Sequence, residues 1–68
     1  MTDTVKLRQK IRDSGYRIHF VAEKIGLSYQ GFQNKVENRQ DFRTSEIKGL
    51  CDLLGIDAQE RDAIFFCG

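Results

Sequence analysis

The stretch that decides the fold is residues 21–32, Val21-Ala22-Glu23-Lys24-Ile25-Gly26-Leu27-Ser28-Tyr29-Gln30-Gly31-Phe32. Two short helices cross closely only if the first offers a small side chain and the turn a residue that tolerates positive φ. Ala22 and Gly26 meet these needs, Ser28 is a suitable N-cap for the second helix, and Phe32 is placed to return to the core. The stretch therefore predicts a helix-turn-helix. The alternative is an ordinary helix pair in a small bundle.

Two predicted helices precede the turn. The first runs from about residue 4 to 14, is capped by Asp3 or Thr4, and ends at Gly15. The second follows Tyr16-Arg17, and its apolar stripe at i, i+3, i+4 and i+7 consists of Ile18, Val21, Ala22 and Ile25. Phe20 lies off this stripe. We expect Phe20 to pack against another helix, with partial exposure as the alternative.

Three predicted helices follow the turn. The third runs from Ser28 to about Glu37, with Phe32 and Val36 directed inward, and a turn at 38–41 then returns Phe42 to the core. The fourth is capped by Thr44 or Ser45, ends at Gly55, and has an inward stripe of Ile47, Leu50, Cys51 and Leu54. Asp57 caps a short fifth helix that includes 63–66.

Length and composition predict one all-α domain over residues 1–68. The chain is 40% hydrophobic and 31% charged and has no proline, which favours helices over a β-sandwich or disorder. No apolar run is long enough to span a bilayer, and the N-terminus does not resemble a signal peptide, so we expect a cytoplasmic protein with no membrane contact. Cys51 is interpreted as a small core hydrophobe. With Cys67 near the end and no CxxC spacing, neither a disulfide nor a metal site is expected.

The net charge of +1 conceals a gradient along the chain. Residues 1–43 contain nine Lys or Arg and five acidic residues, whereas residues 44–68 contain two and five, giving net charges of +4 and −3. The positive part contains the predicted helix-turn-helix, as expected for a nucleic-acid-binding surface. A solvated face without a partner would show the same imbalance.

Several short elements, taken in order, resemble helix-turn-helix regulators of the Cro/CI type, in particular short phage and prophage repressor-like proteins of Gram-positive bacteria. The matching elements are residues 21–28 (VAEKIGLS), 32–38 (FQNKVEN), Phe42, 45–47 (SEI), 53–56 (LLGI) and 64–66 (IFF). The resemblance implies a five-helix Cro/CI-repressor-like domain and sequence-specific binding of double-stranded DNA, usually as a dimer on a two-fold symmetric operator. It also implies a role in a phage lysis or lysogeny decision inside the bacterial host. This chain departs from the family at Arg17 and Ile18, where Thr and Gln are common.

The outer side of the third predicted helix is the candidate DNA-contacting surface, since a helix-turn-helix places its second helix in the major groove. Amide side chains suit bidentate contact with adenine, and a tyrosine ring packs on sugar or a thymine methyl. The candidate base contacts are Ser28, Tyr29, Gln30, Gln33 and Asn34, with Gln30 and Gln33 ranked first. Simple exposure is the alternative for each amide.

Basic residues flanking that helix are the candidate phosphate contacts, namely Arg17, Lys35, Arg39 and Arg43. Glu37 would repel phosphate, so we expect it at the edge of the groove or held by a base such as Arg39. Phe65 and Phe66 are adjacent and cannot both face one core. We therefore expect one to complete the monomer and the other to meet a partner in a homodimer, with shielding of both by the same chain as the alternative.

Two other functions are weighed against DNA binding. The first is an antirepressor or modulator that binds a larger repressor protein; the low net charge and the missing Gln at the start of the second helix favour it. The second is an enzyme, which we do not expect because no convergent titratable groups, phosphate loop or cofactor motif are present and His19 is a lone histidine. No catalytic residue, cofactor or small-molecule substrate is predicted.

Overall fold

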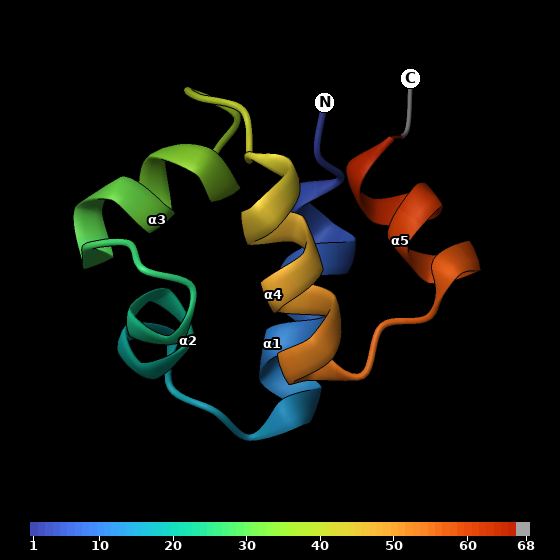
Figure 1. Cartoon of the computed structure of the whole chain (residues 1–68), viewed down its shortest axis with the longest axis horizontal. Coiled ribbons are helices and arrows are strands. Elements are labelled where there is room, and N and C mark those ends of the chain that lie inside the picture. Colours follow the sequence, from blue (N-terminus) through green and yellow to red (C-terminus); the bar gives the residue numbers. More distant parts are fainter. Residues whose placement is uncertain (67–68) are drawn as a thin grey trace.

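Five α-helices form the described part of the chain, residues 1–66 of this computed structural model: α1 (Thr4–Ser14), α2 (Ile18–Lys24), α3 (Tyr29–Val36), α4 (Thr44–Leu54) and α5 (Ala58–Phe65) (Figure 1). No strand occurs in these 66 residues, so the predicted all-α class is confirmed. Cys67, for which neither a disulfide nor a metal was expected, lies outside the described residues. None of the helices in this region is both long and apolar enough to cross a membrane.

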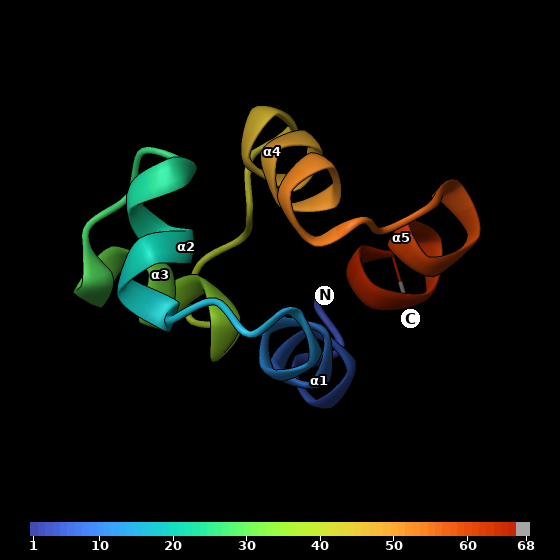
Figure 2. The ribbon, with the colours of Figure 1, turned by 90° about the horizontal axis from the view of Figure 1, so that it is seen from below.

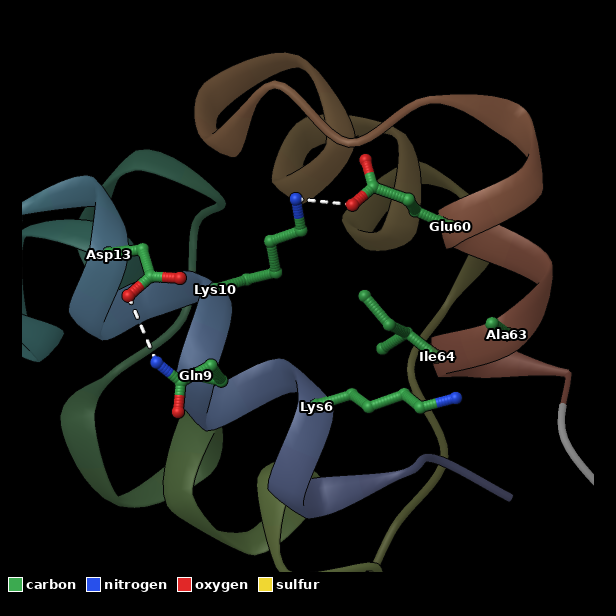
Figure 3. A pocket seen from close by; sticks show the side chains of 7 residues that line it. All are labelled: Lys6, Gln9, Lys10, Asp13, Glu60, Ala63 and Ile64. Carbon is green, nitrogen blue, oxygen red and sulfur yellow. Dashed lines mark hydrogen bonds and ion pairs between the residues drawn. The ribbon is translucent and has the colours of Figure 1, made fainter.

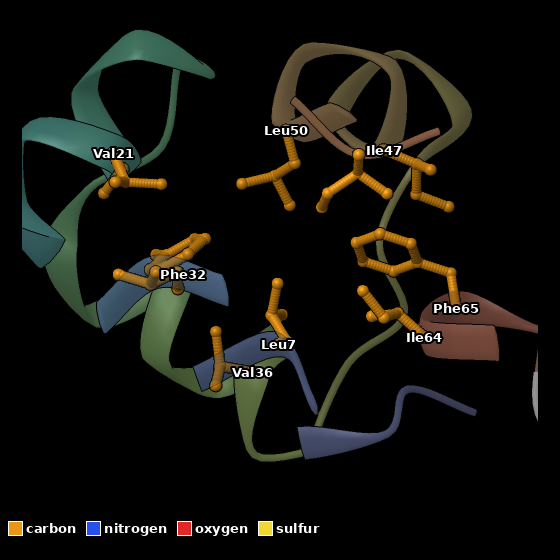
Figure 4. Close-up of a cluster of buried hydrophobic side chains, with 11 residues drawn as sticks. Leu7, Val21, Phe32, Val36, Ile47, Leu50, Ile64 and Phe65 are labelled. Atoms are coloured by element: carbon orange, nitrogen blue, oxygen red, sulfur yellow. The ribbon is translucent and has the colours of Figure 1, made fainter. Parts of the chain in front are cut away.

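α1 and α4 occupy the middle of the molecule, with α2 and α3 on one side and α5 on the other (Figures 1 and 2). Inward side chains from all five helices meet between them (Figure 4). The buried hydrophobic residues are Leu7, Ile11, Val21, Ala22, Phe32, Val36, Ile47, Leu50, Ile56, Ile64 and Phe65. This single core fixes α2 against α4 and α3 against α1, and it leaves the other sides of α2 and α3 to solvent.

The predicted helix ends are confirmed except at the start of α4 and at the end of α5, which stops at Phe65 and leaves the predicted Phe66 outside the helix. Asp3, Ser28 and Asp57 cap α1, α3 and α5 with their side-chain oxygens, and Gly15 and Gly55 end α1 and α4 in the left-handed conformation. The caps expected at Thr44 or Ser45 are wrong, since α4 begins at Thr44 after Arg43 as N-cap.

Arg43 has no side-chain oxygen that could cap α4, so a residue within the first turn of α4 stabilises its start instead. Glu46 Oε1 accepts a hydrogen bond from the Arg43 backbone N–H at 2.8 Å. A carboxylate in the first turn also complements the positive end of the helix dipole. The sequence prediction failed here because it sought a polar side chain at the cap position itself.

Aromatic side chains resolve two further predictions. Phe42 returns to the core as expected and makes edge-on contacts with Phe32 and Phe65, at ring-centroid distances of 6.0 and 5.5 Å. The favoured prediction for Phe20 is wrong, because its ring is 37% exposed and lies 5.0 Å from the exposed Tyr16 ring instead of under another helix. Lys24 Nζ lies 5.4 Å from the centre of the same ring.

The first residues of the chain are held between α3 and α5. Thr2 N–H donates to Asn38 Oδ1 and Asn38 Nδ2 donates to the Thr2 carbonyl, both at 2.9 Å. The Thr4 hydroxyl donates to the carbonyl of the last residue of α3 at 2.8 Å, and Asp3 N–H donates to the Ile64 carbonyl at 2.6 Å. Asn38 is also the one described non-glycine residue with positive φ, +64°. These bonds fix the C-terminal end of α3.

Candidate nucleic-acid interface

The connection between α2 and α3 is a tight turn. Gly26 has a φ of +80°, and Leu27 N–H donates to the Ala22 carbonyl at 2.9 Å, which folds the chain back immediately after α2. Ala22 is 1% exposed, as expected for a small residue under the next helix. Ser28 Oγ then accepts from Gly31 N–H at 3.0 Å and starts α3.

The side of α3 that faces away from the core carries four polar side chains, Tyr29, Gln30, Gln33 and Asn34, which we call the outer face of α3. Tyr29 and Gln30 are exposed, as is the cap residue Ser28, whereas Gln33 and Asn34 are half-buried. The predicted base contacts therefore lie together on one surface, but they differ in how much of each side chain reaches solvent.

Two side-chain pairs divide the outer face of α3. Gln30 Nε2 donates to Asn34 Oδ1 at 3.1 Å, and Gln33 Nε2 donates to Tyr29 Oη at 2.8 Å. Each pair is spaced i, i+4, the separation at which side chains meet on a helix surface. Gln30 and Gln33, the two residues ranked first from the sequence, are thus held by different neighbours: Gln30 by Asn34, and Gln33 by Tyr29.

The side-chain oxygen of Gln33 is also restricted, because it is buried. Its Oε1 is buried without a hydrogen-bond partner, the one such side-chain oxygen or nitrogen found in residues 1–66. The ring of Tyr29, whose hydroxyl accepts from Gln33, is itself stacked on His19 of α2, with centroids 4.2 Å apart and planes 13° from parallel. His19 was predicted to lie on the solvent side, and it does, but nothing at a ten-residue separation indicated the contact with Tyr29.

Lys35 is not available as the predicted phosphate contact. The residue is 8% exposed, and its Nζ donates to both carboxylate oxygens of Glu46, at 2.7 and 2.9 Å. Lys35 lies on the core side of α3, because it is next to the inward-facing Val36 and one helical turn after Phe32. The expected exposed cation is therefore one half of a buried ion pair that joins α3 to α4, and it is withdrawn from the candidate interface.

Glu46, noted in the sequence only as part of the matching element 45–47, is the other half of this ion pair. Burial raises the pKa of its carboxyl, but hydrogen bonds from Lys35 and from the Arg43 backbone N–H, with the positive charges of both side chains, outweigh burial and lower the pKa below its ordinary value. Glu46 is thus a buried anion with two roles. It caps the start of α4 through the Arg43 backbone N–H, and it anchors α3 to α4 through Lys35. The spacing of Arg43 and Glu46 was the available signal for the cap, and nothing indicated the pairing with Lys35.

The other predicted phosphate contacts are exposed. Arg17 precedes α2 and has no side-chain role in capping it, and Arg43 contributes only its backbone to the start of α4. Arg39 Nη2 lies 3.3 Å from Glu37 Oε1, which confirms the expectation that a nearby base holds Glu37. Arg8 of α1 approaches the other oxygen of Glu37 at 3.8 Å. The negative charge of Glu37 is thereby balanced by two arginines at the end of α3.

Phe65 and Phe66 behave as two different residues. Phe65 is 4% exposed and belongs to the core, so its assignment to a dimer surface is wrong, whereas Phe66 is 61% exposed. Together with Met1 and Phe42 they line a shallow groove near the ends of the described chain. The expectation that one phenylalanine completes the monomer is confirmed for Phe65.

A second, more open groove lies between α1 and α5 (Figure 3). Lys10 and Glu60 form an ion pair across it. The hydrogen bond that Lys10 donates to Glu60 raises the pKa of Lys10 and, with the negative charges of Glu60, Asp57 and Asp13, outweighs the lowering by burial. The groove holds no arrangement of a nucleophile and a base. We assign it no chemistry.

No group of three or more His, Cys, Asp or Glu side chains that would hold a metal ion occurs in residues 1–66. Cys51 is half-buried and packs against the core, as predicted. Burial raises the pKa of its thiol, the negative charge of Asp52 adds to this, and Arg61 opposes it.

No protein-family model matches this chain, and comparison with curated proteins and with solved structures also finds no match.

Proposed function

We propose that the protein is a sequence-specific DNA-binding transcriptional regulator of the phage or prophage type, with a Cro/CI-like fold in which α2 and α3 form the helix-turn-helix. The observation that carries this proposal is the outer face of α3, a row of polar side chains that projects from a short helix whose opposite side is anchored by Phe32 and Val36. A helix of this kind enters the major groove with its N-terminal residues against the base edges. The protein would then act in the cytoplasm of a bacterial host.

Arg17, Arg39 and Arg43 would contact phosphates on either side of α3. They provide affinity and orientation but little sequence information. Because Lys35 is buried and cannot reach a phosphate, the number of such contacts in one chain is small. Affinity at physiological salt therefore calls for two chains on half-sites about one helical turn apart.

Phe66 is the proposed centre of the contact between the two chains. It is a large exposed ring beside a groove lined by Met1, Phe42 and Phe65, so the same surface offers both a projecting side chain and a recess, as a two-fold interface requires. Sedimentation with a duplex should give two chains per site for the unaltered protein. Phe66→Ser should weaken this association roughly tenfold or more, whereas Val5→Ser, which removes another exposed apolar side chain from α1, should not change it.

The experiment that tests DNA binding is selection of random duplexes by the purified protein, followed by titration at several salt concentrations. We expect one enriched, two-fold symmetric site and an affinity that falls steeply with salt. Arg43→Ala should weaken binding to all sequences and lower the salt slope by about one. Lys6→Ala is the matched control, because Lys6 lines the groove between α1 and α5, away from α2 and α3 (Figures 1 and 3). Absence of any salt-dependent binding would refute the proposal.

The second candidate function is that of an antirepressor or modulator that binds a larger repressor protein. The exposed aromatic pair of Tyr16, which precedes α2, and Phe20 of α2 favours it, because neighbouring exposed rings are typical of protein-binding surfaces. This function predicts capture of a repressor that Phe20→Ser abolishes, without binding of duplex DNA even at low salt.

A further inference from the structure

The two hydrogen-bonded pairs on the outer face of α3 leave different atoms available to a ligand. A bidentate contact with adenine needs a carbonyl oxygen to accept from the base amino group and an adjacent N–H to donate to N7. Any side chain that makes this contact must therefore present both ends of its amide to solvent. Gln30, Gln33 and Asn34 can each be tested against that requirement.

Gln33 does not meet the requirement. Its Oε1 is buried, so no base can reach the acceptor, and one of its Nε2 hydrogens is donated to Tyr29 Oη. The Tyr29 ring is in turn held against His19. Releasing Gln33 would require breaking its bond to Tyr29 and turning the amide outward.

Gln30 meets the requirement. The side chain is exposed, and only one of the two Nε2 hydrogens is used, in the bond to Asn34 Oδ1. The other hydrogen and the Oε1 acceptor are not used by the bond to Asn34, so the exposed amide keeps one donor and one acceptor for adenine. Asn34 is half-buried and so has less freedom to turn than Gln30. Its carbonyl oxygen therefore serves as a fixed point that orients the longer side chain.

We propose that Gln30 is the adenine-contacting residue of α3, that Asn34 is a positioning residue that orients the Gln30 amide, and that Gln33 makes no base contact because Tyr29 holds it inward. This assignment rests on the proposed function. It narrows the three amides predicted from the sequence to one contact and one support.

The test is duplex selection by the unaltered protein and by four variants, Gln30→Ala, Asn34→Leu, Asn34→Asp and Gln33→Ala, each first shown by circular dichroism to be folded. The unaltered protein should require an A·T pair at one position of each half-site. Gln30→Ala should lose about five- to 150-fold of the discrimination at that position, the range typical of a bidentate pair. Gln33→Ala should keep it.

The two Asn34 variants separate positioning from packing. Asn34→Leu removes the acceptor for Gln30, and the entropy of an unrestrained side chain should reduce discrimination at the same position roughly two- to tenfold. Asn34→Asp keeps an acceptor oxygen, so it should retain the base preference while its charge weakens binding to every sequence. A merely structural role for Asn34 would change affinity but not the preference for adenine.

The failure of this assignment is distinguishable from failure of the proposed function. If no duplex is enriched and no salt-dependent binding occurs, the proposed function is wrong and the assignment is wrong with it. If a site is enriched but Gln30→Ala or Asn34→Leu keeps the full preference at every position, or Gln33→Ala removes the A·T requirement, the assignment alone is overturned.

Discussion

Replacement of Lys35 by methionine is expected to destabilise the domain strongly at neutral pH. The change leaves the Glu46 carboxylate buried, with a side chain 9% exposed and only the Arg43 N–H as a hydrogen-bond partner. Removing one partner of a buried ion pair typically costs about 3–5 kcal/mol because the remaining charge is uncompensated. Since Glu46 keeps the Arg43 bond, we expect the lower end, about 3 kcal/mol.

A loss of this size is large for such a short chain. In a domain of this size class, 1 kcal/mol shifts the melting temperature by about 4–8 °C, so the variant should melt roughly 12–24 °C lower. Thermal and urea denaturation followed by circular dichroism measure the change. The Lys35→Met/Glu46→Gln double variant is the control, because the neutral amide keeps an acceptor for the Arg43 N–H and leaves no buried charge. It should recover most of the lost stability.

The pH dependence gives a sharper check, with a defined sign. In the unaltered protein the pKa of Glu46 is lowered on folding, so the stability from its ionised form is present above the unfolded pKa of about 4.3 and is lost as the pH falls through the folded value. In Lys35→Met the ammonium that lowers this pKa is gone and burial remains, so the pKa rises. The difference in stability between the two proteins should therefore shrink between pH 7 and pH 4. A difference that stays constant, or a melting temperature unchanged at pH 7, would refute the buried pair.

Three further residues, Asn38, Gly26 and Cys51, provide tests of other features. Asn38→Ala should cost about 2 kcal/mol, because it loses the bonds to Thr2 and keeps a positive φ, whereas Asn38→Gly should cost less since glycine tolerates that φ; urea denaturation ranks the two. Gly26→Ala should cost about 1–2 kcal/mol from backbone strain alone, because an added Cβ there meets no atom within 4 Å; a cost near zero in thermal melts would contradict the turn geometry. Cys51 should react with a thiol reagent more slowly at pH 7 than after unfolding in urea, because its pKa is raised in the folded state; equal rates would contradict its burial.

Most of the fold could be predicted from the sequence because its determinants are local. The caps at Asp3, Ser28 and Asp57 and the left-handed glycines act within one turn of their helix, and the apolar stripes repeat at the helical period. Each feature is specified within about a dozen neighbouring residues, so no knowledge of the other helices is needed.

The errors concern contacts between elements. Lys35 and Glu46 are 11 residues apart on different helices, and periodicity alone does not show that a lysine beside Val36 turns toward a carboxylate on α4. Whether Phe65 or Phe66 enters the core depends on where α5 ends against α1 and α4. In the candidate interface the sequence identified the surface but not the pairing of its amides, which depends on the rotamers of Gln33 and Tyr29.

The attachment of residues 2–4 to both α3 and α5 has a consequence for how the molecule opens. Chain ends usually fray, and their amide hydrogens exchange rapidly with solvent through local opening. Here Thr2 and Asp3 donate to residues 36 and 61 positions away, so releasing either amide means separating the first segment of the chain from elements that also hold the core. The amides of these two residues should therefore exchange as slowly as those of α4. A change that loosens α5 should also speed exchange at the C-terminal end of α3.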